Sequence, residues 1–560
     1  MSNERQSKLK ILLVWPNKDG FGFKPISLAL LSAIAKKKGC EVKLFDATSI
    51  DFGHVINAKS VEEAKLTKPV DMSAYNMVKR KVSLRAEFAK VFNEFDPDCV
   101  AFTVLSDEYI IADKITKIAR DLKKDVKIIW GGKYPTLEPE ETLTVHGVDY
   151  VCVNEGLDAW GEFIDALSSS GDTTKIQNIW TKQGGKIISN ETRPVRDDLD
   201  GLPHGDWSIY DDRHFYKPYD GKVVRGGDHM INWGCPYKCS YCINQFNHDT
   251  YDNNYSMRRY GVKRIVDELE IMKDTYNLEF FRFHDEDFLM RPIQNLEELS
   301  EEYQKRVNLP FSIETNPKSV TERRAQLLKN MNCVSASLAI ETGDMKLRKE
   351  LLDRPDTRED VVSAFKIMRN NGIRTCAFNL LAIPFETRET YWETVKVNRE
   401  AEGQYPFIHF FYPFHGTPLR DVAIKEGLWD PDGVDKNNVY ERDLPALRFK
   451  NLTEDELVQM RKAFVLYVKL PEAYHGFIKR SETPDKTGTL LRGKLLDIYD
   501  NTVWDNEGWY KDDGRTEEYL LSLSDVLEGN TSQIDAPTSD RCSSTIDQFV
   551  AKNPQYDSTC

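Results

Sequence analysis

The sequence predicts an α/β protein: a doubly wound, Rossmann-like domain, then a partial (β/α)6 barrel of the TIM-barrel type, then an α-rich C-terminal domain. Two long stretches alternate short β-branched runs with amphipathic segments, which is typical of parallel sheets covered by helices. A third stretch shows helical periodicity, clearest in 454–468. The chain has 560 residues, enough for about three to five domains at roughly 100 to 200 residues each.

The first domain is expected at residues 1–169. Its predicted strands are 11–15, 42–46, 99–104, 126–130 and 148–153. A doubly wound sheet binds ligands beyond the carboxyl ends of its strands. The loops that follow these strands are therefore expected to line one crevice, namely 16–25, 105–108, 131–136 and 154–156.

Residues 170–227 are rich in glycine and charge, which indicates a connector with one hairpin. The barrel is expected at 228–424, with strands at 230–233, 280–283, 311–314, 334–340, 374–383 and 407–412. Barrel active sites lie at the carboxyl ends of the strands. Residues 425–524 form the predicted α-rich domain. Residues 525–560, dominated by Ser, Thr, Asp and Gln, are expected to be a mobile tail.

Composition excludes several classes of protein. The chain has 76 Lys plus Arg against 90 Asp plus Glu, a net charge of -14, so no nucleic-acid partner is expected. The longest apolar runs fall short of the roughly 18 residues that cross a bilayer, so no membrane span is expected. The amino-terminal residues lack the pattern of a signal peptide, which favours a cytoplasmic location. In that reducing compartment the ten cysteines would stay free thiols.

Three cysteines stand together in the segment NWGCPYKCSYCINQ. Cys235, Cys239 and Cys242 have C-x3-C-x2-C spacing directly after a predicted strand. Three thiolates on one short loop can bind three irons of a 4Fe-4S cubane and leave the fourth iron open to a small molecule. The alternative is a structural zinc site of three cysteines and a nearby histidine, for which His248 is available.

At these residues the sequence resembles the radical S-adenosylmethionine (SAM) superfamily, whose motif has an aromatic residue before the third cysteine. The resemblance continues through FFRFHDEDF and SLAIETGDMKLRKELLDR. It implies a set of SAM-binding residues: Tyr241, Asp285, Glu286, Asp287, Glu341 and Arg354. The segment LLAIPFET resembles the G-x-P-G-E-T signature of the fifth strand, but Ala382 and Phe385 replace both glycines.

The first domain resembles the cobalamin-binding (B12-binding) domain fused to one subgroup of these enzymes, through FDPDCVAFTVLSDEY, VKIIWGGKYPTLEPEETL and GVDYVCVNEG. The residues implied to contact cobalamin are Leu105, Ser106, Asp107, Glu108, Gly131, Gly132, Tyr134, Pro135, Glu155 and Gly156. The D-x-H-x-x-G signature that supplies a histidine to cobalt elsewhere is absent, which matches this subgroup. An α/β domain that has lost its cofactor is the alternative.

Radical methylthiotransferases are a second alternative, because they bind an additional cluster through three N-terminal cysteines. The candidates here are Cys40, Cys99 and Cys152. Cys40 and Cys99 are predicted at the amino ends of strands and Cys152 near the carboxyl end of another, so they cannot converge on one metal. We interpret them as small buried residues.

The resemblance implies an enzyme in which a reduced cluster cleaves SAM and a methyl group is transferred through cobalamin to an unactivated carbon of a small-molecule substrate. Its partner would be an electron donor such as flavodoxin or ferredoxin. A non-methylating cobalamin-dependent reaction, such as ring contraction, cyclisation or oxidation, is the alternative. A corrinoid-binding or zinc-stabilised module without radical chemistry is the alternative of another class. Catalytic residues and the substrate's identity are not readable from the sequence.

Overall fold

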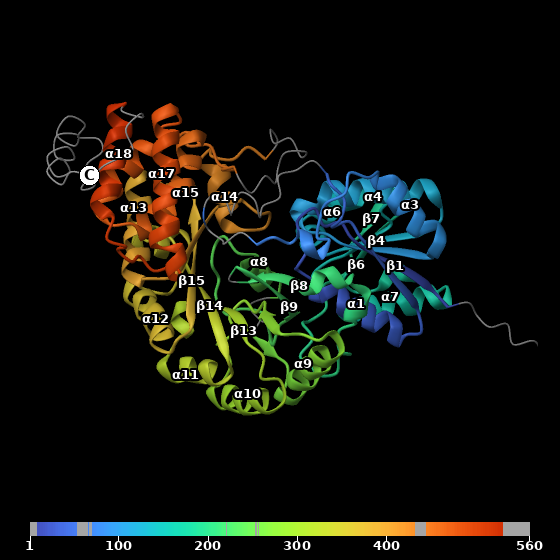
Figure 1. The fold of residues 1–560 in the computed structure, drawn as a ribbon. Helices are drawn as coiled ribbons and strands as arrows, with labels where there is room; N and C mark the ends of the chain where they lie inside the picture. The colour runs from blue at the N-terminus through green and yellow to red at the C-terminus, as the bar shows by residue number, and fades with distance from the viewer. Residues whose placement is uncertain are drawn as a thin grey trace, which may run out of the picture.

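The computed structural model describes residues 8–52, 65, 70–219, 221–251, 255, 257–431 and 444–529. Figure 1 shows the first domain in blue beside a curved sheet in green and yellow, with a group of helices in orange and red at the other side. Chain order is therefore also spatial order.

The first domain contains a parallel sheet in the order β2-β1-β3-β4-β5. The five predicted strands are confirmed as β1 (Lys10–Trp15), β2 (Glu41–Asp46), β3 (Cys99–Thr103), β4 (Lys127–Gly131) and β5 (Tyr150–Cys152). Alternate residues of β1 pack on opposite faces, Ile11 with one set of helices and Leu12 with the other. The first set is α1 (Ile26–Lys37) and α7 (Leu157–Ser169), and the second is α3 (Leu84–Phe95) and α4 (Tyr109–Leu122). Both faces are thus buried, as in a doubly wound sheet.

The connector contains two hairpins where the sequence predicted one. The first, β6 (Ile179–Gln183) and β7 (Lys186–Ile188), extends the sheet of the first domain antiparallel to β5. Gly184 and Gly185 form its turn with φ of 58° and 79°, which residues with a side chain rarely adopt. The second hairpin, β8 (Tyr216–Tyr219) and β9 (Lys222–His229), belongs to the sheet of the barrel.

Six parallel strands form the partial barrel, in the order β16-β15-β14-β13-β12-β9. After β9 they are β12 (Phe280–Phe283), β13 (Phe311–Thr315), β14 (Cys333–Glu341), β15 (Arg374–Leu381) and β16 (Tyr405–Phe410). The helices α9 to α12 follow the outer side of the curved sheet (Figure 1). The barrel helices are α9 (Val262–Tyr276), α10 (Ile293–Arg306), α11 (Glu322–Asn330), α12 (Arg358–Asn370) and α13 (Arg388–Ala401). The inner side is left for ligands.

The first barrel strand differs from the prediction of 230–233. The structure uses β9, and Asn232–Trp233 instead forms a short antiparallel pair, β10, with β11 (Arg258–Arg259). The glycines at 226 and 227 indicated a turn, but here they allow close packing. A Cβ on Gly227 would lie 2.7 Å from the Phe281 ring, so β12 approaches β9 only because that position has no side chain.

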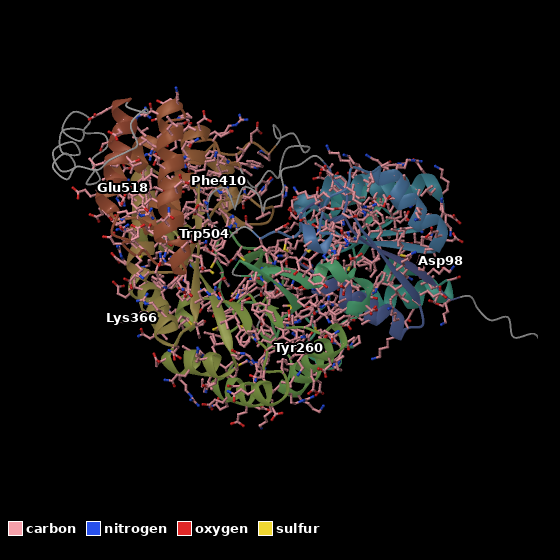
Figure 2. The ribbon with its side chains drawn as sticks, in the orientation of Figure 1. Asp98, Tyr260, Lys366, Phe410, Trp504 and Glu518 are labelled. Carbon is pink, nitrogen blue, oxygen red and sulfur yellow. The ribbon has the colours of Figure 1, made fainter. Side chains whose placement is uncertain are left out.

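The C-terminal region is α-helical, as expected. Its helices are α14 (Pro418–Lys425), α15 (Glu454–Lys469), α16 (His475–Ser481), α17 (Lys486–Thr502) and α18 (Thr516–Glu528). Helices α15 to α18 share a hydrophobic core with β16 and α13, and Phe410 of β16 and Trp504, both labelled in Figure 2, belong to this core. Most of the expected tail, residues 530–560, lies outside the described residues. No described helix is long and apolar enough to cross a membrane.

Candidate functional site

The three cysteines lie on a loop between β10 and α8 (Ile243–Thr250), and main-chain contacts hold this loop on both sides. The Ser240 amide donates to the Leu352 carbonyl at 3.1 Å, and the Ser240 carbonyl accepts from the Leu419 amide at 3.0 Å. Cys235 and Cys239 are buried and Cys242 is partly exposed. The loop is therefore fixed by its neighbours, with its sulfurs in a sheltered position.

The chemistry of the cysteines fits an iron-sulfur cluster. Burial raises the pKa of Cys242 to about 11 and also raises that of Cys239, so the thiolates that bind iron need the charge of the metal. The described residues contain no group of three His, Cys, Asp or Glu side chains arranged around one metal ion. A cubane binds each thiolate to a different iron, so the sulfurs need not converge. His248, the proposed zinc ligand, donates from Nε2 to the Cys235 carbonyl at 2.9 Å.

Three of the side chains implied to bind SAM meet beside this loop. The Tyr241 hydroxyl donates to Glu341 Oε1 at 2.9 Å and accepts from Arg354 Nη1 at 2.9 Å. Arg354 and Glu341 approach to 3.8 Å. The loop, the end of β14 and the segment after it thus contribute one residue each. Glu341 has a φ of 63°, a left-handed conformation that is strained for a non-glycine residue and is often found at functional sites.

The three acidic residues after β12 have different environments. Asp285 is fully buried and accepts from the main-chain amides of Ile231 and Asn232, the latter at 2.6 Å. Asp287 is buried and accepts from the Thr315 and Ser319 hydroxyls, each at 2.5 Å. Both carboxylates therefore hold the protein framework. Glu286 keeps an exposed surface, but the protein atoms that enclose its carboxyl raise its pKa through desolvation, against the lowering effects of Lys133, Asn244 and the Gly234 amide. Of the three, only Glu286 is placed to reach a ligand.

The loops after β3, β4 and β5 lie at the carboxyl ends of three neighbouring parallel strands, where the sequence predicts part of the crevice. Leu105, Gly132 and Lys133 are exposed there, and Asp107 and Gly131 are partly exposed. A Cβ on Gly132, which has a φ of 108°, would lie 2.7 Å from the Val104 carbonyl oxygen. Glycine is therefore required at position 132, because a side chain there would collide with the main chain at the end of β3, and the loop after β4 can pack directly on that strand end.

Several residues implied to contact cobalamin are instead part of the domain interior. Glu108 accepts from the Trp15 indole at 3.2 Å and from the Leu105 amide at 2.8 Å. The residues buried in this way are Ser106, Glu108, Tyr134 and Pro135. A Cβ on Gly156 would lie 2.9 Å from the Cys152 sulfur, so Gly156 serves loop packing. These residues pack in the domain interior, and their contact with cobalamin stays a prediction.

Glu155 points across to the barrel. Its carboxylate accepts from Arg258 Nη1 at 2.9 Å, and the two side chains are 15% and 5% exposed. The pair joins the loop after β5 to β11, beside the cysteine loop. Cys40 and Cys99, by contrast, are buried at the amino ends of β2 and β3, and Cys152 lies at the carboxyl end of β5.

Two further observations bear on whether the crevice suits cobalamin. Asn154 Oδ1, in the loop after β5, is buried without a hydrogen-bond partner among the described residues, so it can accept from an amide group of a ligand. The corrin ring carries such amides at its periphery. Lys133, which the sequence analysis did not single out, acts electrostatically on both Cys242 and Glu286. The positive charge of Lys133 and its position in a predicted crevice loop could have identified it from the sequence.

Comparison with known proteins agrees with this geometry. The radical SAM superfamily model matches residues 232–397, and the B12-binding domain model matches residues 17–164. An uncharacterized methyltransferase of Pyrococcus horikoshii is 23% identical over 402 residues, which cover 70% of this chain and 85% of that protein. The anaerobic magnesium-protoporphyrin IX monomethyl ester cyclase of Rubrivivax gelatinosus is 24% identical, over 66% of this chain and 67% of the cyclase.

The fold is also that of a solved enzyme. The cobalamin-dependent SAM radical enzyme OxsB, with aqua-cobalamin and SAM bound, superposes with a TM-score of 0.61 at 14% identity, covering 99% of this chain and 85% of that one. The two domains and the cysteine loop thus define an enzyme built around two cofactor sites. The chain belongs to the radical SAM superfamily, in the subgroup that carries a cobalamin-binding domain. Its cofactors are a 4Fe-4S cluster, SAM and cobalamin.

Proposed function

We propose that this enzyme transfers a methyl group to an unactivated carbon of a small-molecule substrate. The observation that carries the proposal is the meeting of the two cofactor sites. Glu155, in the loop after β5 of the first domain, pairs with Arg258 of β11 beside the cysteine loop at 2.9 Å, and Leu137 of the first domain packs with Phe246 of α8 around Gly416. A methyl donor in the crevice and a radical source at the cysteine loop would therefore face the same space.

Each site has residues with a defined task in this proposal. Cys235, Cys239 and Cys242 hold the cluster. Tyr241, Glu341 and Arg354, which are held in place by the hydrogen bonds that they share, bind SAM, and Glu286 accepts from its amine. Leu105 and Gly132 face cobalamin in the crevice. Asp285 and Asp287 are positioning residues, because each anchors the main chain or side chains around the loop.

When bound, the cluster with SAM supplies a 5'-deoxyadenosyl radical, and cobalamin supplies the methyl group. The chain's own contribution is to align the two sites and to exclude water from the space between them. The buried Glu155–Arg258 pair joins the first domain to the barrel beside the cysteine loop. Gly416, in the loop after β16, packs on Phe246 of α8 and on Leu137 of the first domain. This loop therefore contacts both the helix that follows the cysteine loop and the first domain.

Anaerobic reconstitution tests the proposal. Wild-type enzyme supplied with iron, sulfide and cobalamin is expected to bind four irons and one cobalt per chain and, once reduced, to release 5'-deoxyadenosine from SAM. Cys239→Ala is expected to lose the iron and the 5'-deoxyadenosine. Cys40→Ala, which removes a buried sulfur far from the loop, is the matched control. Zinc in place of iron in the wild type contradicts the proposal.

The similarity to a cyclase supports a second candidate, a cobalamin-dependent reaction without methylation. Incubation of the reconstituted enzyme with a metabolite extract and SAM labelled in its methyl group separates the two. A product that carries the label supports methyl transfer. A product without the label that forms only when both cofactors are present supports the second candidate.

We also propose that flavodoxin or ferredoxin reduces the cluster and that the enzyme works in the cytoplasm. The need for a reduced cluster and for free thiols supports both statements. Replacement of a chemical reductant by flavodoxin and its reductase, with 5'-deoxyadenosine as the readout, tests the electron donor.

A further inference from the structure

A group of charged side chains lies at the first two strands of the barrel, apart from the cysteine loop. We call Lys24, Lys217, Asp228, Arg282 and His284 the basic cluster. The Asp228 carboxylate is at its centre and accepts from Lys217 Nζ at 2.7 Å and from His284 Nε2 at 2.8 Å. Lys24 Nζ lies 2.9 Å from the same carboxylate. One buried carboxylate thus contacts three basic side chains.

The sequence builds this cluster through strand register and one glycine. Asp228 on β9 is paired with Arg282 on β12, so the two residues lie at the same level of the sheet. A Cβ on Gly226 would lie 2.6 Å from Lys217 Cδ, so the stem of Lys217 passes over β9 at the place where no side chain exists. Lys217 then reaches Asp228 from the hairpin partner β8.

The outer part of the cluster is open. Phe281 and Phe283 of β12 pack into the core beneath the outer helices, so the alternating residues Arg282 and His284 point to the inner side of the barrel. Their side chains are 35% and 28% exposed, whereas Lys24 and Asp228 are fully buried. Arg282 also approaches Glu314 of β13, at 3.6 Å. The inner side of the barrel therefore presents an accessible guanidinium over a buried charge group.

The basic side chains in these contacts outnumber the carboxylates. Lys24, Lys217 and Arg282 are basic, and two carboxylates, Asp228 and Glu314, oppose them. Burial lowers the pKa of Lys217 to about 7, against the opposing effect of Asp228. A second negative charge nearby would favour the protonated form of Lys217, and the protonated lysine would in turn attract that charge.

An aromatic side chain of the first domain lies against the cluster. Phe23, in the loop after β1, has its ring 4.8 Å from the Arg282 guanidinium carbon and 6.3 Å from the His284 ring. It contacts these barrel residues and still remains 51% exposed. Lys24, the next residue, is the member of the cluster that the first domain contributes. The open side of the cluster therefore lies where the two cofactor domains meet.

We propose that the basic cluster binds an acidic group of the substrate, a carboxylate or a phosphoryl group, with an apolar part of the substrate against Phe23. Arg282 and His284 contact the acid, and Lys217 and Lys24 supply the positive field behind them. This inference rests on the proposed function, since it assigns the substrate class to the space between the two cofactor sites. It names a specificity site separate from the cluster and SAM residues.

The test uses reconstituted enzyme with SAM bound, so that Arg354 is not available to the probe. The probes are benzoate and phenylphosphonate, with benzyl alcohol as the uncharged analogue, and binding is followed by proton NMR titration. We expect at least one acid to bind wild-type enzyme saturably and benzyl alcohol not to compete. Arg282→Gln is expected to weaken acid binding about tenfold, because the contact with a charged partner is lost.

Glu314→Gln is expected to strengthen acid binding, whereas a folding defect would weaken it. Removal of its carboxylate frees Arg282, so acid binding is expected to tighten about threefold. Arg323→Gln, on the exposed outer face of α11, is the control and is expected to bind as wild type does. Equal binding by wild type and Arg282→Gln, or no binding of either acid to wild type, overturns the inference. Iron content, cobalt content and SAM cleavage report separately on the proposed function.

Discussion

At the scale of single residues, the side chains implied to bind SAM divide according to what holds them. The carboxylates of Asp285 and Asp287 are already satisfied by main-chain amides or hydroxyls. Tyr241, Glu341 and Arg354 satisfy one another through a single hydroxyl. The sequence motif implied the same role, binding of SAM, for all of these residues. The hydrogen-bond partners distinguish carboxylates that anchor other parts of the barrel from three side chains that are joined to one another beside the cysteine loop.

Tyr241→Phe tests this arrangement. The change removes the hydroxyl that joins Glu341 to Arg354 and leaves both buried charges less well satisfied. We expect the affinity for SAM to fall roughly tenfold with unchanged iron content, as measured by calorimetry on the reconstituted enzyme. Tyr303→Phe removes the same atom from a tyrosine that bonds the Leu309 carbonyl in the outer layer. If both variants bind SAM as tightly as wild type does, the hydroxyl has no role in SAM binding.

The buried carboxyl of Glu108 makes the stability of the folded chain depend on pH. Burial, with a smaller effect from Asp107, raises the pKa of its carboxyl to about 8. The folded chain therefore holds this proton more tightly than the unfolded chain, in which the pKa is about 4.3. The resulting stabilisation is complete below the unfolded value and is lost as the pH rises through 8.

Glu108→Gln cannot titrate and lacks this dependence. We expect the Tm of the variant, relative to wild type, to increase between about pH 5.5 and about pH 8.5. Thermal unfolding followed by circular dichroism at both pH values measures the change. Glu140→Gln, on the exposed first turn of α6 (Pro139–Thr144), controls for the removal of a negative charge. A Tm difference that stays constant across this range contradicts the raised pKa.

At the scale of secondary-structure elements, glycines and their replacements explain where the prediction failed and where it was incomplete. Gly226 and Gly227 indicated a turn, although they lie inside β9. After β15 the reverse holds, because Ala382 and Phe385 adopt φ values of 62° and 65° at the two positions where the signature that this segment resembles has glycine. Local sequence cannot distinguish these cases, because the space next to a glycine is set by other strands.

Ala382→Gly is expected to stabilise the protein. The alanine is strained at a φ of 62°, and relief of that strain exceeds the entropy lost by a glycine. We expect Tm to rise by about 2 °C. Ala377→Gly, at a buried position within β15 and outside the left-handed region, is the matched control and is expected to lower Tm. A lower Tm in both variants would show that Ala382 is not strained.

At the scale of the whole molecule, the relative placement of the two cofactor domains depends on residues far apart in the sequence. Glu155 and Arg258 pair across the domain boundary. Lys24 of the first domain pairs with Asp228 of the barrel. Both pairs are largely or fully buried, so their charges stabilise one docking geometry only when both partners are present.

Glu155→Gln leaves Arg258 buried without its carboxylate. We expect the free energy of unfolding to fall by about 3 kcal/mol and cobalamin to be retained less well. A double-mutant cycle with Arg258→Met, followed by chemical denaturation, measures the coupling between the two side chains. Glu297→Gln, in the exposed pair with Arg323, is expected to change stability by less than about 0.5 kcal/mol. No coupling in the cycle would mean that the pair does not fix the domains.

The sequence by itself determined the two α/β domains, the α-rich end and the position of the cysteine motif. These features depend on hydrophobic periodicity and local spacing, which are properties of neighbouring residues. Tertiary structure decided that β9 is the first barrel strand, that Asp285 and Asp287 face the framework, and that Glu155 faces Arg258 and not the crevice. It also assembled the basic cluster from residues 24 to 284. Burial and pairing across such distances arise only when the chain has folded, because the partners share no local pattern.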